Sequence, residues 1–166
     1  MDVLRLTVVR HASALASRPD QEDRDRLLDT RGQQQAREMA RRLAAAHGPP
    51  ERILSSPALR AISTATLMCE ELGLSSGQIL TDERLYPGSA TLTLEVIHEL
   101  GESASHLMVV GHNPGLSELA ARLSSEPKIS SLPTCGVYTL EFAGVVWSEI
   151  GWASGVNPRL HVPGHE

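Results

Sequence analysis

The segment VLRLTVVRHAS (residues 3–13) changes from apolar to polar near its centre. Val3–Val9 is rich in β-branched residues, which favour extended backbone, so this half predicts a first strand. Arg10-His11-Ala12-Ser13 follows at the point where that strand should end. The segment therefore predicts a strand that carries charged and polar side chains to one end of a sheet.

Two later segments show the same change. Arg52–Ser55 predicts a short strand, and the cluster Ser55-Ser56-Pro57-Ala58-Leu59-Arg60 stands at its end. His106–Val110 is apolar at nearly every position, as a strand covered on both faces should be, and Gly111-His112-Asn113-Pro114-Gly115 follows it. Because open α/β sheets bind ligands at the carboxyl ends of their strands, these clusters predict a binding site.

Helical segments alternate with the strands. Ser17 to Asp29 has no apolar period and predicts a loop, whereas Thr30 with Gln33 three residues later predicts a capping box that opens a helix. Apolar residues at positions 36, 39, 40, 43 and 44 would form the buried face of this helix, which Gly48-Pro49-Pro50 should end. Further helices are expected over residues 57–72, 91–100 and 114–124.

The remaining segments complete an α/β pattern. Ile79–Leu80 predicts a weak strand, Val137–Phe142 and Val145–Ile150 predict an antiparallel hairpin, and Asn157–Glu166 predicts a loosely packed tail. The expected fold is a three-layer α/β sandwich, with a mostly parallel central sheet, helices on both faces and an antiparallel edge. The strand order does not follow from these patterns.

Composition limits the classes of protein that remain. The 166 residues have a net charge of −5 and are 41% hydrophobic, which predicts one domain over residues 1–166 with a core of its own. Arginine outnumbers lysine fourteen to one, Lys128 being the single lysine, and no basic run occurs. We therefore expect no nucleic-acid partner, and we regard the arginines as individual ligands.

Location follows from similar arguments. The apolar run Leu4 to Val9 is about six residues long and contains Arg5, so it is too short for a signal peptide or a membrane span. Cys69 and Cys135 have no disulfide framework or metal-binding spacing, and we expect both to be buried, reduced thiols. These features predict a cytoplasmic protein with no membrane partner.

The three clusters share a chemistry. Together they offer two arginines, two histidines and two helix N-termini, which are the groups that bind a phosphoryl group. Taken singly, each has an ordinary explanation: a surface ion pair, a hydrogen-bonded structural histidine, a helix cap or a turn. Their joint occurrence at three strand ends favours a phosphate site. The other histidines lack the spacing of metal ligands, so no metal and no cofactor are predicted.

The order of these motifs resembles a known family. Val8-Val9-Arg10-His11-Ala12, SSPALRA (residues 55–61) and VGHNPG (residues 110–115) are similar to the signature of the histidine phosphatase, or phosphoglycerate-mutase-like, superfamily. The short chain and the GHNP form resemble its SixA-type phosphohistidine phosphatases, as do RLLDTRGQQQA (residues 26–36) and TDERLYPG (residues 81–88). The resemblance spans nearly the whole chain and implies a phosphoglycerate-mutase-like fold.

The resemblance also implies roles for individual residues. His11 would be the nucleophile, and Arg10, Arg60 and His112 would hold the phosphoryl oxygens. Glu83 matches the proton donor of mutase-like members, although a surface carboxylate is an equal alternative. The candidates for further substrate contacts are Arg26, Asn113 and Ser13, with a solvated charge as the alternative for Arg26.

The chain departs from the family pattern at three positions. Ala12 replaces the usual glycine after the catalytic histidine, so its backbone must adopt a conformation open to residues with a side chain. Asp29 stands where threonine or serine is common, and Ser13 stands where many relatives carry an acidic residue. None of these changes removes a catalytic group.

The resemblance implies a metal-independent phosphatase with a covalent phosphohistidine intermediate on His11. The expected substrate is phosphohistidine on a signalling or phosphotransfer protein, such as a histidine phosphocarrier. A phosphatase for small phosphoesters, such as sugar phosphates, is the alternative, and a non-catalytic phosphate-binding module is a third. The oligomeric state remains open.

Overall fold

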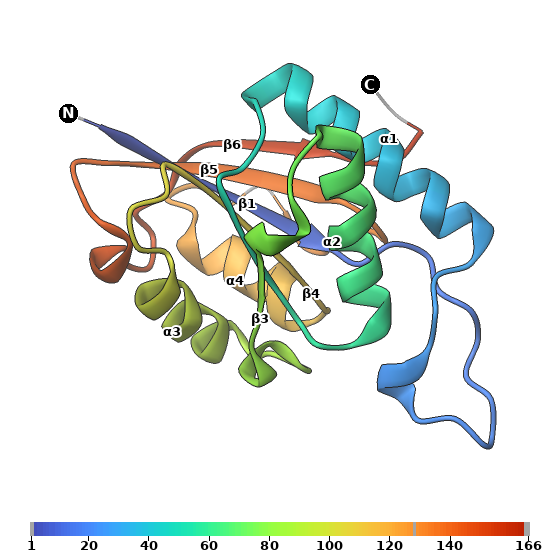
Figure 1. The fold of residues 1–166 in the computed structure, drawn as a ribbon. Coiled ribbons are helices and arrows are strands. Elements are labelled where there is room, and N and C mark those ends of the chain that lie inside the picture. The colour runs from blue at the N-terminus through green and yellow to red at the C-terminus, as the bar shows by residue number, and fades with distance from the viewer. Residues whose placement is uncertain (1, 128, 165–166) are drawn as a thin grey trace.

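The computed structural model describes residues 2–127 and 129–164 (Figure 1). Six strands form one sheet in the spatial order β3-β2-β4-β1-β5-β6. Their bounds are β1 Val3–Arg10, β2 Arg52–Ser55, β3 Ile79–Thr81, β4 His106–Gly111, β5 Val137–Ala143 and β6 Val156–His161. Neighbours from β3 to β1 pair in parallel, and β5 pairs antiparallel with both β1 and β6. The predicted mostly parallel sheet with an antiparallel edge is confirmed.

Four α-helices cover the two faces of the sheet. Their bounds are α1 Thr30–His47, α2 Leu59–Leu72, α3 Ala90–Leu100 and α4 Gly115–Leu123. Figure 1 shows α1 and α2 on one side of the sheet and α3 and α4 on the other. Each layer has its own core, since Val9 and Met108 pack toward α1 and α2 whereas Val8 and Val109 pack toward α3 and α4. The three-layer sandwich is thus also confirmed.

Strand register brings the three predicted clusters to one end of the sheet. Arg10 at the end of β1 pairs with Gly111 at the end of β4, and Ser55 at the end of β2 pairs with Val110. Because these strands are parallel neighbours, the segments that follow them leave the sheet side by side. The loop between β1 and α1, at the lower right of Figure 1, extends beyond this same end.

The predicted hairpin is wrong in its second strand. Val145–Ile150 contains a 3₁₀ helix at Trp147–Glu149, and β5 pairs instead with β6. The Trp147 indole is buried, donates its N–H to the carbonyl of Ala104 at 2.7 Å and lies against Gly101, where a Cβ would come within 2.4 Å of the ring. These contacts hold the segment against α3 and away from the sheet.

The predicted loose tail is also wrong, because its first half belongs to the strand that pairs with β5. Residues 157–161 belong to β6, while residues 165–166 lie outside the described residues. As an edge strand with most side chains exposed, β6 shows no alternation of apolar and polar residues. Sequence periodicity therefore could not reveal it.

Helix starts differ from the prediction by one or two residues. The N-cap of α1 is Asp29, whose carboxylate accepts a hydrogen bond from the backbone N–H of Gly32 at 2.7 Å, so the capping box on Thr30 is wrong. The helix α2 starts at Leu59, after a turn at Pro57. A short 3₁₀ helix, η1 (Asp23–Asp25), lies inside the predicted loop.

Two other expectations concern burial and hydropathy. Cys69 and Cys135 are buried free thiols, as predicted. Among the described residues, no helix combines the length and the apolar character needed to cross a bilayer.

Candidate active site

A cavity of about 420 Å³ lies at the carboxyl end of the sheet. Residues from all three predicted clusters line it, together with residues from the η1 loop and the loop before α3. The lining residues are Arg10, His11, Asp23, Arg26, Arg60, Tyr86, Pro87, His112 and Asn113. The structure therefore brings together six of the eight candidate residues, and it places Glu83 and Ser13 outside this lining.

His11 is held as a neutral imidazole with a defined tautomer. Its Nδ1 donates a hydrogen bond to the carbonyl oxygen of Ala12 at 2.8 Å, and this leaves the lone pair on Nε2. Burial lowers the pKa of His11 to about 4, and the positive charges of Arg60 and Arg10 act in the same direction. At neutral pH the ring can therefore act as a nucleophile.

His112 lies beside His11. The two imidazole rings have their centroids 5.2 Å apart, and the Nε2 atom of His112 is 2.7 Å from the hydroxyl oxygen of Ser56. Ser56 in turn accepts the backbone N–H of Ala58, so the second cluster orients the third. Burial, followed by the charges of the neighbouring groups, lowers the pKa of His112 to about 3.

Arg10 and Asn113 are positioned by the segment before β5. Arg10 donates from Nη1 to the carbonyl oxygen of Leu132 at 3.1 Å, and its buried Nε atom has no partner among the described residues. Asn113 donates to the same carbonyl at 2.9 Å and accepts the hydroxyl of Ser117 at 2.6 Å. Both side chains are thus fixed at the cavity wall.

Arg60 is the most deeply buried cation of the site. Its side chain is 7% exposed, and its two terminal nitrogens donate to Asp23: Nη1 to the backbone carbonyl at 2.7 Å and Nη2 to the carboxylate at 2.8 Å. Arg26 also donates to this carboxylate at 3.2 Å, as does the Tyr86 hydroxyl at 2.8 Å. The hydrogen bond from Tyr86, and then those from the two arginines, hold the pKa of the Asp23 carboxyl well below its ordinary value.

Glu83 and Ser13 lie elsewhere. The Glu83 carboxylate is exposed and forms a two-point ion pair with Arg24 at 3.1 and 3.2 Å. The Ser13 hydroxyl donates to Asp29 at 2.7 Å and so supports the cap of α1. Both side chains serve contacts at the periphery of the site.

The Ala12 position shows why a methyl group is tolerated there. Ala12 is fully buried among the apolar side chains under α1 and α2, and it is not one of the residues with positive φ. Its backbone N–H donates to the Thr64 hydroxyl at 2.9 Å. The backbone here therefore needs no glycine.

Sequence reasoning missed Asp23, Tyr86 and Pro87 as lining residues. Asp23 belongs to the charged stretch QEDRDR, which has no local feature to separate one carboxylate from the next. Tyr86 is one of only two tyrosines in the chain and stands in the quoted TDERLYPG segment, so its rarity was the available signal. Within residues 2–127 and 129–164, no group of three or more His, Cys, Asp or Glu side chains is placed to hold a metal ion.

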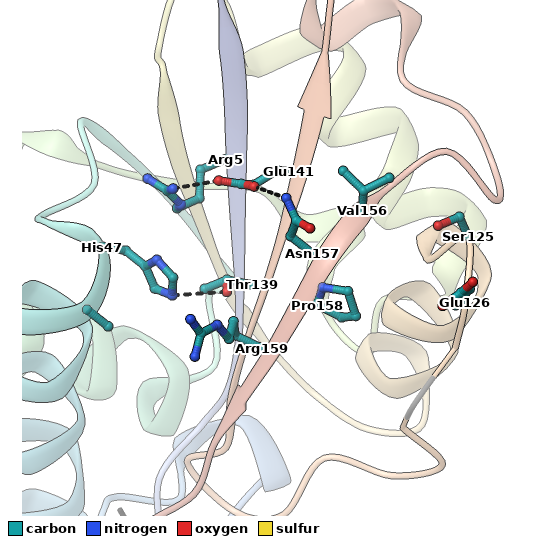
Figure 2. Close-up of a pocket in the computed structure, with 11 residues that line it drawn as sticks. Arg5, His47, Ser125, Glu126, Thr139, Glu141, Val156, Asn157, Pro158 and Arg159 are labelled. Atoms are coloured by element: carbon teal, nitrogen blue, oxygen red, sulfur yellow. Dashed lines mark hydrogen bonds and ion pairs between the residues drawn. The ribbon is translucent and has the colours of Figure 1, made fainter.

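A second cavity, of about 760 Å³, lies around the edge strand β6 (Figure 2). Arg5 and Asn157 both donate to the Glu141 carboxylate, at 2.7 and 2.6 Å, and His47 Nε2 lies 3.2 Å from the Thr139 hydroxyl. Its lining includes none of the three strand-end clusters. We therefore assign the candidate active site to the smaller cavity.

Comparisons with known proteins agree with this geometry. The model of the histidine phosphatase superfamily (branch 1) matches residues 6–86. Two curated relatives from Mycobacterium tuberculosis strains, the uncharacterized proteins MT1313 and Rv1276c, are each 32% identical over 90 residues. The match covers 49% of this chain and 56% of each relative, so it spans about half the length of these proteins.

Solved structures match nearly the whole chain. A protein histidine phosphatase SixA complexed with tungstate has a TM-score of 0.80 at 25% identity, covering 96% of this chain and 97% of that one. A protein assigned as phosphohistidine phosphatase SixA from Nakamurella multipartitia has the same TM-score at 21% identity, with 99% of both chains covered. The mycobacterial glucosyl-3-phosphoglycerate phosphatase Rv2419c has a TM-score of 0.64 at 21% identity, covering 96% and 98%.

Proposed function

We propose that this chain is a phosphatase of the histidine phosphatase superfamily with His11 as its nucleophile, because the superfamily model matches residues 6–86 and a protein histidine phosphatase SixA shares the fold over 96% of the chain. The observation that supports the proposal most directly is the hydrogen bond from His11 Nδ1 to the Ala12 carbonyl. It fixes the tautomer in which Nε2 has a free lone pair, inside a cavity lined by three arginines.

The reaction would proceed in two displacements. The Nε2 lone pair of His11 forms a bond to phosphorus while the bond from phosphorus to the leaving group breaks, and the leaving group takes a proton from solvent. Water then attacks phosphorus, the N–P bond breaks, and the lone pair returns to Nε2. The proton lost by that water passes to solvent, and orthophosphate leaves.

Fixed cations would stabilise both transition states. Negative charge spreads over the phosphoryl oxygens in such reactions, and guanidinium groups pair with two oxygens at a time. Arg10, Arg60 and Arg26 line the cavity, and His112 lies beside His11. These groups would supply the positive charge, and the proposed mechanism requires neither a metal nor a cofactor.

The leaving group points to phosphohistidine as the substrate. Glu83 is outside the cavity lining, and the one carboxyl group among the described lining residues, Asp23, has a pKa well below its ordinary value. The site therefore offers no protonated carboxylic acid at neutral pH. An alcohol needs such a proton donor to leave, whereas the imidazole of phosphohistidine needs less help. We propose phosphohistidine on a phosphotransfer or signalling protein as the substrate class.

A small phosphoester is the second candidate. The fold similarity to a glucosyl-3-phosphoglycerate phosphatase supports keeping it. The volume of about 420 Å³ is also within the usual range for small-molecule sites. A panel that compares kcat/KM on a phosphohistidine-containing carrier with that on sugar phosphates separates the two candidates.

The decisive experiment uses His11→Ala with His161→Ala as a control outside the cavity. We expect His11→Ala to abolish turnover and the acid-labile phosphoenzyme, and the control to retain both. Arg10→Ala should lower kcat/KM about 10²–10³-fold, by analogy with the loss of one oxyanion donor. Acid-labile label that persists on His11→Ala would contradict the nucleophile assignment, and phosphate binding without any turnover by the wild type would favour a binding module.

A further inference from the structure

Asp23 accepts four hydrogen bonds from side chains at the cavity, three at its carboxylate and one at its backbone carbonyl. Two come from Arg60, one of them to the Asp23 carbonyl, one comes from Arg26 and one from the Tyr86 hydroxyl. Planar guanidinium groups bind carboxylate and phosphate with the same paired geometry. The donors around Asp23 are therefore the ones that a phosphoryl group would need.

We propose that Asp23 is a resident anion of the phosphate position, which a substrate must displace before its phosphoryl oxygens can reach Arg60. The inference rests on the proposed function, since it concerns how the same cavity admits its substrate. It assigns to the η1 loop a gating role that depends on one carboxylate.

Burial explains why an incoming anion would compete with Asp23 for Arg60, whose buried Nε atom has no partner among the described residues. The Arg60 side chain is 7% exposed, and both of its terminal nitrogens already donate to Asp23. The Asp23 side chain is 49% exposed, so it is the more solvent-accessible partner of this pair. An oxyanion that enters from solvent thus meets the carboxylate first, and like charges repel each other.

The η1 loop is suited to such a movement. No residue of η1 is buried, and the turn is three residues long. Besides the bonds of Asp23 itself, the turn is held by the exposed ion pair between Arg24 and Glu83. It is also held by the exposed hydrogen bond from Gln21 to the Asp25 carbonyl at 3.0 Å. The Arg24 guanidinium also lies 5.2 Å from the centroid of the Tyr86 ring. Exposed ion pairs contribute little to stability, so the bonds of Asp23 hold the loop closed. A phosphoryl group that accepts the same donors would replace those bonds.

Charge then determines which anions can open the gate. When a singly charged anion replaces the Asp23 carboxylate, the net charge beside the three lining arginines does not change. A phosphoryl dianion adds one unit of attraction to the same cations. The gate therefore selects dianionic phosphoryl groups over carboxylates and other singly charged anions.

Asp23→Asn tests this proposal with a matched control. The amide keeps the size of the side chain and one accepting oxygen but removes the charge. Asp25→Asn removes the same charge from the same turn, and its backbone carbonyl, rather than its carboxylate, accepts a hydrogen bond from Gln21. Calorimetric titration with inorganic phosphate at pH 8 measures the dissociation constant of each protein.

We expect Asp23→Asn to bind phosphate at least about tenfold more tightly than the wild type, because charge-assisted hydrogen bonds are about twice as strong as neutral ones. Asp25→Asn should remain within about twofold. Hydrogen exchange over residues 21–27 of the wild type should become faster when phosphate binds. Equal or weaker binding by Asp23→Asn, or slower exchange with phosphate, would overturn the gate and make Asp23 a residue that positions Arg60.

This outcome can be distinguished from failure of the proposed function. Phosphate binding and hydrogen exchange are measured without turnover. A chain that binds phosphate more tightly after Asp23→Asn, yet hydrolyses no substrate, would retain the gate and lose the phosphatase assignment. If the wild type hydrolyses substrate and Asp23→Asn binds phosphate with the same dissociation constant as the wild type, the phosphatase assignment stands and the gate is wrong.

Discussion

The protonation state of His11 is the property on which the nucleophile assignment depends most strongly. Burial and the neighbouring arginines lower the pKa of its imidazole to about 4, against an ordinary value of 6.5. Both effects disfavour the imidazolium form, because they penalise a positive charge. Acidification from pH 7.5 to pH 5.5 therefore separates a buried nucleophile from an ordinary surface histidine.

The expected difference is large. With a pKa of about 4, roughly 97% of His11 remains neutral at pH 5.5, since the neutral fraction follows from the difference between pH and pKa. With the ordinary value of 6.5, about 9% would remain neutral at that pH. The concentration of competent nucleophile would thus fall about tenfold in the second case and scarcely change in the first.

Nitrogen NMR of protein labelled with ¹⁵N at histidine measures this directly. The His11 signal is assigned as the resonance that is missing from the spectrum of the His11→Asn variant. The same chain unfolded in urea supplies the reference titration near 6.5. We expect a midpoint near 4 and, above it, a protonated Nδ1 with an unprotonated Nε2. A midpoint between 6 and 7, or the opposite tautomer, would refute both the burial argument and the choice of Nε2 as the attacking atom.

Three further predictions concern the rest of the molecule. Glu83→Gln should leave kcat on a phosphohistidine carrier within about threefold, because its carboxylate is paired at the surface, and a loss near the 10²-fold expected for a proton donor would restore that role. Gly115→Ala should lower the free energy of unfolding by about 2 kcal/mol or more, because its Cβ would lie 1.7 Å from the Gly88 carbonyl oxygen, whereas Gly151→Ala meets nothing within 4 Å and should be neutral or stabilising in urea titrations. The pKa values of three buried histidines are lowered to about 3 or 4, so between pH 6.5 and 4 the unfolded chain binds more protons and stability should fall as the pH falls, by about 1 kcal/mol per pH unit for each histidine. Urea midpoints at pH 6 and pH 5 measure that slope. His106→Gln should reduce it by about 1 kcal/mol per pH unit, the contribution of one histidine. A flat profile would contradict these pKa shifts.

Local sequence was sufficient to predict strands and helices wherever burial leaves a strong pattern of apolar residues. The apolar run His106–Val110 lies in β4, and four of the five predicted apolar positions of the first helix are buried, whereas Ala44 is half-buried. Edge strand β6 has no such pattern, because its side chains are mostly exposed. Val145–Ile150 misled the hairpin prediction, because residues that favour a strand here lie in a segment whose Trp147 side chain is buried within a 3₁₀ turn.

The site shows the same division. The clusters after β1, β2 and β4 could be read from sequence, because each is a continuous stretch and parallel strands end at a common edge. Side-chain pairings between distant segments could not. Asp23 and Arg60 are 37 residues apart, and Arg24 and Glu83 are 59 apart, so nothing local indicates which carboxylate faces which guanidinium.

The sequence by itself thus established which groups stand at the ends of the strands, because hydrophobic periodicity and turn residues act over a few neighbouring positions. Only the tertiary structure decided that Asp23 enters the cavity and that Glu83 stays outside it. That choice depends on where the η1 loop folds back over α2, and ion pairs have no counterpart to the periodicity that reveals a strand or a helix. The chemistry of the site was encoded in continuous motifs, whereas its access was encoded in a contact between segments.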